Sequence, residues 1–165
     1  MATSVPATQA IRALRAGGVA FELHSFAYVE RGGTAASSAA LGVPEHSVVK
    51  TLIFETGRGE PLCVLMHGDR RVSTKELARL LGEKLIRPCE PSVAERHTGY
   101  QVGGTSAFGM RRAMPIYVER TILDLPTLWM NGGRRGLLVS LQPDALVRVL
   151  GAKPVDVSQA TDTGS

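Results

Sequence analysis

The sequence predicts an α+β fold built on a mixed sheet. The chain has 165 residues, of which 44% are hydrophobic and 21% charged, and this is typical of one ordinary globular domain. Two β-rich runs flank the short segment Gly57-Arg58-Gly59, which indicates a hairpin. Strand and helix patterns interleave without a regular βα repeat, which favours an α+β fold with a mixed sheet.

The first elements follow from apolar spacing and from glycine stops. Ile11 and Leu14 lie at helical spacing, and Pro6 fits the first turn of that helix. Gly42 ends a short alanine-rich segment that has helical composition. The predicted elements are a helix over about residues 6–16, a strand over Val19–His24 and a helix over Thr34–Leu41.

The central elements carry the clearest local signals. The hairpin strands are predicted over Val48–Phe54 and Pro61–Met66, because both runs are rich in β-branched and apolar residues. Ser73 and Glu76 have capping-box spacing, and Gly82 supplies a stop. A helix is therefore predicted between them, with its apolar face formed by Leu77, Leu80 and Leu81.

The last third of the chain predicts two helices and three strands. Ser92 and Glu95 repeat the capping-box spacing, so a short helix is expected from Pro91 to His97. Pro143 begins the final helix, which Gly151 ends, and the polar residues after Lys153 are expected to fray. The strands are expected over residues 115–119, 127–130 and 137–141, with Gly132-Gly133 turning the second toward the third.

Composition excludes several classes of protein. The sequence has no run of about 18 apolar residues and no signal-peptide pattern, so no membrane partner is expected. Its two cysteines, Cys63 and Cys89, are too few for a disulfide framework and indicate a reducing, cytoplasmic location. The net charge of +4 lies entirely between Arg96 and Gly136, where six arginines face two carboxylates.

A glycine-rich stretch is the densest unusual feature. Four glycines occur between Gly99 and Gly109, and glycines allow backbone amides to face a ligand without an intervening Cβ. The alternative is a turn that merely needs positive φ. The stretch matches neither a Walker loop nor a dinucleotide fingerprint, because the strand–glycine–helix context is missing.

Two sets of cations are also unusual. Strand alternation places Lys50 on the same face as Leu52 and Phe54, where an ammonium either snorkels to water or enters a ligand cleft. The turn at residues 131–136 carries Arg134 and Arg135, which are either solvated charges or phosphate ligands. The four histidines show no metal-ligand spacing and no acidic arrangement, so no metal is expected, and Cys63 is expected to be a buried thiol.

Three motifs together resemble the YbaK/EbsC family of aminoacyl-tRNA deacylases, which is related to the editing domain of bacterial prolyl-tRNA synthetases. The motifs are the Val49-Lys50-Thr51-Leu52 strand, the Thr98-Gly99-Tyr100-x-Val102-Gly103-Gly104-x-Ser106 loop and the Gly132-Gly133-Arg134-Arg135-Gly136-Leu137 turn. The resemblance covers about residues 5–157 and implies a barrel-like mixed sheet flanked by helices. We therefore expect one domain over residues 1–157 and a flexible tail over 158–165.

The resemblance also implies a function. It implies trans-editing: hydrolysis of mischarged tRNA that carries a small amino acid, with Cys-tRNA(Pro) as the type substrate, without a cofactor and with prolyl-tRNA synthetase as an associated partner. A synthetase pocket made for proline cannot strongly reject cysteine or alanine, so a second site must clear the error. The implied catalytic residues are Lys50, Gly103 and Gly104; the implied substrate contacts are Phe26, Thr51, Thr105 and Ser106; the implied tRNA contacts are Arg111, Arg112, Arg134 and Arg135.

In this hypothesis, amides of Gly103 to Ser106 polarise the ester carbonyl while Lys50 anchors the carbonyl or the ribose. In cysteine-editing relatives the substrate thiol itself attacks the ester. Three positions depart from the family pattern: Phe26 replaces a frequent tyrosine, Ala107 a proline and Leu138 an aspartate. Two alternatives remain, a non-catalytic tRNA-binding or synthetase-accessory module and a small-molecule hydrolase.

Overall fold

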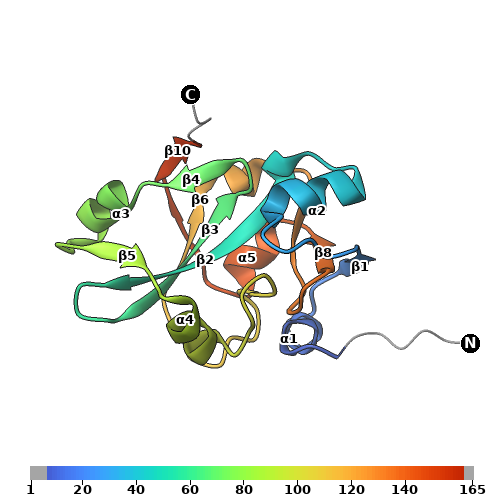
Figure 1. Cartoon of the computed structure of the whole chain (residues 1–165), viewed down its shortest axis with the longest axis horizontal. Helices are drawn as coiled ribbons and strands as arrows, with labels where there is room; N and C mark the ends of the chain where they lie inside the picture. The colour runs from blue at the N-terminus through green and yellow to red at the C-terminus, as the bar shows by residue number, and fades with distance from the viewer. Residues whose placement is uncertain (1–6, 162–165) are drawn as a thin grey trace, which may run out of the picture.

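The computed structural model describes residues 7–161, which form an eight-stranded mixed sheet, a two-stranded sheet and five α-helices (Figure 1). The helices are α1 (Gln9–Ala16), α2 (Gly33–Leu41), α3 (Thr74–Leu81), α4 (Pro91–Thr98) and α5 (Asp144–Arg148), and 3₁₀ turns cover Glu45–Ser47 and Arg120–Asp124. The strands are β1 (Phe21–Ser25), β2 (Val48–Thr56), β3 (Pro61–His67), β4 (Arg70–Val72), β5 (Ile86–Pro88), β6 (Ile116–Glu119), β7 (Leu128–Asn131), β8 (Leu137–Leu141), β9 (Lys153–Val155) and β10 (Ser158–Ala160).

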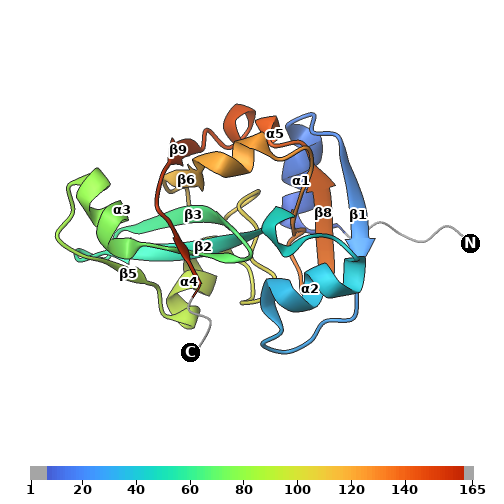
Figure 2. The same ribbon diagram turned by 90° about the horizontal axis from the view of Figure 1, so that it is seen from above.

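The large sheet has the strand order β1-β8-β7-β2-β3-β6-β9, with β5 paired to β2, and β4 pairs with β10 separately. β2 runs antiparallel to β3 and β5 but parallel to β7, and β6 runs parallel to both β3 and β9. The predicted mixed sheet is therefore confirmed. Figure 2 shows β1 and β8 running across the direction of β2 and β3, so the sheet coils strongly along its length.

β2 separates two hydrophobic clusters. Val49 and Ile53 pack on one side with residues of α1 and α5, while Phe54 and Leu52 pack on the other side against α3. Lys50 lies between Val49 and Thr51 in this strand, so it shares the face of Leu52, as the alternation predicted. The hairpin of β2 and β3 is confirmed, with Cys63 opposite Ile53 and completely buried.

Most helix boundaries follow the predicted signals. The hydroxyl of Ser73 accepts a hydrogen bond from the Glu76 amide, and Gly82 ends α3 in the left-handed conformation with φ of +67°. α1 begins later than predicted, at Gln9, because Thr8 caps it. Pro6, which was expected in its first turn, lies outside the described residues.

The capping box predicted at Ser92 is wrong. Pro91 occupies the first turn of α4, and Glu90 precedes the helix, so Ser92 already lies inside it. The Glu95 carboxylate instead accepts a hydrogen bond from the Val102 amide at 3.1 Å. This contact ties α4 to the glycine-rich loop that follows.

The fraying predicted after Lys153 is also wrong for residues 153–160. β9 pairs with β6, and β10 pairs with β4. Between these strands, the Val157 amide donates to the carboxylate of Glu119 at 2.8 Å, and both residues are buried. Because β9 and β10 have only three residues each, their hydropathy gives little signal and their order comes from the partner strands. The ordered chain thus extends beyond the expected boundary at residue 157.

None of the helices in residues 7–161 is long and apolar enough to cross a membrane.

Candidate functional site

The glycine-rich loop and the arginine turn meet at one end of the sheet. A Cβ on Gly104 would lie 2.8 Å from the Cα of Arg134 and 2.9 Å from the backbone nitrogen of Arg135, which is closer than side chains approach. The Asn131 side chain, at the end of β7, donates a hydrogen bond to the Gly103 carbonyl at 3.0 Å. Two of the motifs that the sequence singled out therefore lie together in one candidate site.

The base of the loop is anchored in the core. The Tyr100 hydroxyl donates to the Phe108 carbonyl at 2.6 Å, and both side chains are buried. Burial raises the pKa of Tyr100 to about 12, so it remains a donor. Ser106 is completely buried, and its hydroxyl accepts from the Phe108 amide at 3.1 Å. The seven residues between Tyr100 and Phe108 are thus closed into a loop that is fixed at both ends.

Only some amides of this loop are available to a ligand. The Gly104 amide donates to the Gln101 carbonyl at 2.8 Å, and the Val102 amide is engaged by Glu95. Within residues 7–161, the amides of Gly103, Thr105 and Ser106 have no acceptor, and Ser106 is completely buried. Gly103 is exposed and has φ of +89°, a conformation that favours glycine. The expected oxyanion donors that a ligand can reach are therefore the amides of Gly103 and Thr105, on either side of Gly104.

Tyr28 lies at the candidate site, and no pattern in the sequence pointed to it. A Cβ on Gly103 would lie 2.8 Å from the Tyr28 hydroxyl, and the guanidinium carbon of Arg135 lies 4.9 Å from the centre of the Tyr28 ring. Phe26, which was expected to contact substrate, is half-buried, and its amide donates to the Gly136 carbonyl at 3.0 Å. The hydroxyl that reaches the loop therefore belongs to Tyr28, two positions after Phe26.

Lys50 lies one strand away from the loop. Val49 pairs with Met130 in the parallel β2–β7 pair, and the next residues of the two strands are Lys50 and Asn131. Partial burial lowers the pKa of Lys50, and the nearby carboxylates of Glu45 and Asp69 oppose that shift. No hydrogen bond joins Lys50 to the loop in the part of the chain that is described. The structure thus places Lys50 near the site without bringing it into contact with Gly103.

Thr51 carries a buried polar atom without a partner. Its hydroxyl oxygen has no hydrogen-bond partner within residues 7–161. The side chain lies on the face of β2 that also carries Val49 and Ile53, opposite to Lys50. A buried hydroxyl without a partner costs about 1–3 kcal/mol, so such groups are uncommon unless a ligand uses them.

A polar cluster adjoins Lys50 on the side away from the loop. The His46 Nδ1 and the Asp69 carboxylate are joined by a hydrogen bond at 2.8 Å, and His46 stacks on the buried His67 with 3.7 Å between ring centres. Ligand atoms of these three residues lie within 4.8 Å of one another, which the sequence spacing did not predict. Both ring nitrogens of His67 already contact oxygens, those of the His46 carbonyl and the Thr121 hydroxyl, at 2.7 Å each. Coordination by His67 would break one of these contacts.

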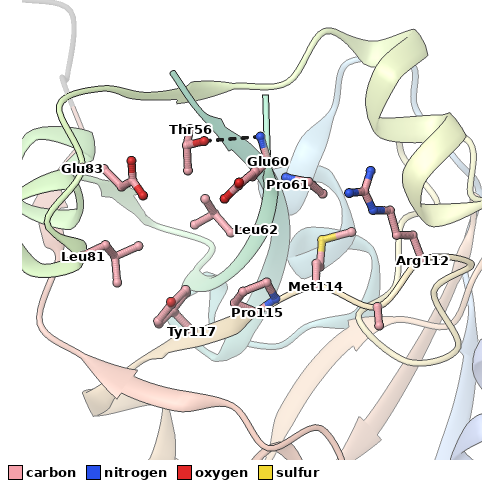
Figure 3. A pocket seen from close by; sticks show the side chains of 11 residues that line it. Thr56, Glu60, Pro61, Leu62, Leu81, Glu83, Arg112, Met114, Pro115 and Tyr117 are labelled. Atoms are coloured by element: carbon pink, nitrogen blue, oxygen red, sulfur yellow. Dashed lines mark hydrogen bonds between the residues drawn. The ribbon is translucent and has the colours of Figure 1, made fainter. Parts of the chain in front are cut away.

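The other basic pair lies at the far end of the loop. Arg111 and Arg112 are exposed, and their amides donate to the carbonyls of Thr98 and His97, the last residues of α4. A cleft of about 400 Å³ begins at Arg112 and extends toward Glu60, Glu83 and Tyr117 (Figure 3). Apart from Arg112, none of the expected site residues lines this cleft. The two arginine pairs are therefore separated by the glycine-rich loop.

Two positions that depart from the family pattern lie in the interior. Ala107 and Leu138 are 2% and 4% exposed, so both act as packing residues. Leu138 lies opposite His24 in the β1–β8 pair and opposite Asn131 in the β7–β8 pair. The residue opposite Asn131 in the β7–β8 pair is therefore apolar.

Comparison with known proteins gives consistent results. A family model described as the aminoacyl-tRNA editing domain matches residues 31–149. The chain is 26% identical to EbsC of Enterococcus faecalis, assigned as a Cys-tRNA(Pro)/Cys-tRNA(Cys) deacylase, over 152 residues that cover 92% of this chain and 93% of that protein. It is 33% identical to a proline–tRNA ligase of Nitratidesulfovibrio vulgaris over 114 residues, which cover 67% of this chain but only 20% of the ligase.

Solved structures share the fold. The crystal structure of the hypothetical protein APE2540 matches with a TM-score of 0.84 at 28% identity, covering 92% of this chain and 99% of that one. A protein assigned as a trans-editing enzyme for prolyl-tRNA synthetase matches with a TM-score of 0.82 at 24% identity, covering 94% and 100% of the two chains. The second match supports the fold alone.

Proposed function

The chain belongs to the aminoacyl-tRNA editing domain family, and on that premise we propose that the protein is an aminoacyl-tRNA deacylase that hydrolyses mischarged tRNA. The observation that carries this proposal is the meeting of the glycine-rich loop with the arginine turn, where Gly104 allows backbone-to-backbone contact at Arg134. The loop presents two accessible amides without acceptors, those of Gly103 and Thr105, beside the guanidinium groups of Arg134 and Arg135. Such amides are suited to a developing oxyanion, and guanidinium groups are suited to phosphates.

In the proposed reaction, a nucleophile adds to the carbonyl carbon of the ester between the amino acid and the terminal ribose. The carbonyl oxygen gains negative charge and is stabilised by the amides of Gly103 and Thr105. The bond from the carbonyl carbon to the ribose oxygen then breaks, and that oxygen leaves as a hydroxyl after taking a proton. We assign to Lys50 the binding of the carbonyl or the ribose, and we assign no substrate contact to Thr51, whose side chain lies on the opposite face of β2.

The nucleophile is either water or a thiol of the substrate. A thiol of pKa about 8.5 is partly ionised near neutral pH and can attack its own ester, after which water releases the product. Neither Cys63 nor Cys89 fits this task, because burial raises the pKa of Cys63 to about 12 and burial beside Glu55 raises that of Cys89 to about 11. The proposed site therefore uses no cysteine of the protein.

We propose a small amino acid as the group removed, with cysteine on tRNA(Pro) as the first candidate, because EbsC is assigned that activity. The similarity to part of a proline–tRNA ligase supports prolyl-tRNA synthetase as the enzyme whose errors are corrected. We expect the reaction to take place in the cytoplasm, where aminoacyl-tRNA is made and used.

A deacylation screen over tRNAs mischarged with cysteine, alanine and other small amino acids tests the proposal. We expect hydrolysis of at least one ester by the wild type and a loss of about a hundredfold or more in Lys50→Ala, the order of one electrostatic contact in a transition state. Lys75→Ala, which removes an exposed lysine of α3, is the matched control and retains activity. Salt-sensitive tRNA binding without hydrolysis of any ester would instead identify a binding module.

A comparison of cysteinyl and S-methylcysteinyl esters on the same tRNA identifies the nucleophile. Attack by the substrate thiol predicts that methylation abolishes hydrolysis, because the sulfur can no longer form the thiolate. An unchanged rate would show that water attacks.

A further inference from the structure

Tyr28 and Arg135 form an exposed pair, and the proposed reaction gives no role to Tyr28. The Tyr28 side chain is 38% exposed, and the guanidinium of Arg135 covers one face of its ring. Val29 and Val102 beside this pair are 54% and 43% exposed, which is high for large apolar side chains. Apolar and aromatic groups that gather at a surface indicate a binding site. We call Tyr28 and Arg135 the stacking platform.

The stacking platform is held in place by hydrogen bonds of the backbone around it. The Nε of Arg135 donates to the Val102 carbonyl at 2.9 Å, which fixes the guanidinium relative to the loop. The Phe26 amide donates to the Gly136 carbonyl and so continues the β1–β8 pairing toward Tyr28. A Cβ on Gly136 would lie 2.8 Å from the Phe26 carbonyl oxygen, so this close approach requires glycine. Groups fixed in this way lose little conformational entropy when they bind a ligand.

The stacking platform directly borders the amides of the proposed ester site. A Cβ on Gly103 would lie 2.8 Å from the Tyr28 hydroxyl and 3.2 Å from the Nε of Arg135. A substrate carbonyl that is bound at Gly103 therefore has its neighbouring groups at Tyr28. The positive charge of Arg134 and Arg135 on the same turn favours an anionic chain there.

The chemistry of an aminoacyl-tRNA matches this arrangement. Its ester is attached to the ribose of an unpaired terminal nucleotide, so one base lies a single sugar away from the reacting carbonyl. Proteins recognise unpaired bases by stacking them on aromatic rings and on arginine planes. We propose that the stacking platform binds the terminal unpaired base of the tRNA acceptor end; this rests on the proposed function because it places the ester at Gly103.

Binding of a hairpin RNA that mimics the acceptor stem tests the proposal. One RNA ends in the unpaired sequence CCA, and a second lacks the terminal adenosine. We expect the wild type to bind the first RNA more tightly by about five- to a hundredfold at constant salt, the range for one stacked base. Tyr28→Ala loses this preference, whereas Tyr28→Phe retains it because the ring remains. Equal affinity of the wild type for both RNAs, or an unchanged preference in Tyr28→Ala, would overturn the proposal.

Deacylation kinetics of the same variants separate this proposal from the proposed function. We expect Tyr28→Ala to raise KM for mischarged tRNA more than it lowers kcat, with Tyr28→Phe close to the wild type. Val147→Ala, which truncates a side chain that is 45% exposed on α5, is the matched control. Wild-type hydrolysis with an unchanged KM in Tyr28→Ala refutes the platform alone. A preference for the CCA end without any hydrolysis refutes the proposed function alone.

Discussion

The substitution Gly104→Ala tests whether close contact between the loop and the arginine turn is required for activity. The added Cβ would lie 2.8 Å from the Cα of Arg134, so the two segments must separate by about 0.6 Å to reach an ordinary contact of 3.4 Å. All three close atoms belong to the backbone of Arg134 and Arg135 and cannot rotate away. The φ of Gly104 is not in the left-handed region, so the effect comes from this contact rather than from backbone strain.

A shift of this size displaces the neighbouring amides of Gly103 and Thr105 from the ester oxygen. Misplacement by about 1 Å costs roughly a hundredfold in rate, and loss of one oxyanion donor costs about a hundred- to a thousandfold. We therefore expect kcat/KM for a mischarged tRNA to fall by about a hundredfold in Gly104→Ala. Overpacking also destabilises a protein by about 1–3 kcal/mol, so the assay is run well below the melting temperature of the variant.

The control is Gly82→Ala, at the end of α3. Its Cβ would meet nothing within 4 Å, but φ of +67° strains any side chain there. This variant is expected to lose about 1 kcal/mol of stability and to keep its activity. If folded Gly104→Ala deacylated tRNA at the wild-type rate, the backbone contact would have no role in catalysis.

Three further predictions concern the same region. Partial burial lowers the pKa of Lys50, so its ammonium is lost at a lower pH than that of an ordinary lysine. The rate of deacylation, corrected for spontaneous hydrolysis, should therefore decline with rising pH before pH 10.5. Lys50→Ala should lack this decline. Tyr100→Phe leaves the buried Phe108 carbonyl without its donor, so it should lower the free energy of unfolding by about 1–3 kcal/mol. Urea titrations measure this change. A smaller change would show that the loop is anchored elsewhere. Arg134→Ala should reduce the slope of log affinity for tRNA against log salt concentration by about 0.7–0.9. Arg79→Ala, which breaks an ion pair on α3, should leave the slope unchanged. If Arg134→Ala had the same slope as the wild type, Arg134 would not contact a phosphate.

The sequence predicted the elements whose signals are local. The hairpin of β2 and β3 has β-branched strands around a glycine turn, and α3 has a cap at each end. These features depend on neighbouring residues alone, so they can be read without a partner. By contrast, β4, β5, β9 and β10 have three residues each and form only because another strand supplies the hydrogen bonds.

In the candidate site, too, some residues give a local signal in the sequence and others depend on the fold. The glycine loop and the arginine turn stood out as motifs, and the structure brings them together. Tyr28 gave no signal, because it lies in a segment without periodicity and gains its place from the packing of Gly103 and Arg135. The contact between His46 and Asp69 joins residues 23 positions apart and also depends on the fold. Sequence reasoning thus found the unusual residues but not their neighbours.

The parallel pairing of β2 with β7 has a consequence for the chain while it is being made. Val48 and Trp129, which pair there, are 81 positions apart, so Lys50 leaves the ribosome long before Asn131 and Arg135 exist. Contacts between such distant residues form late, because closing the intervening loop costs entropy before any contact repays it. An unfinished chain therefore has glycines and a lysine but no assembled ester site. The proposed ester site therefore depends on pairing that only a chain completed at least through Arg135 can make.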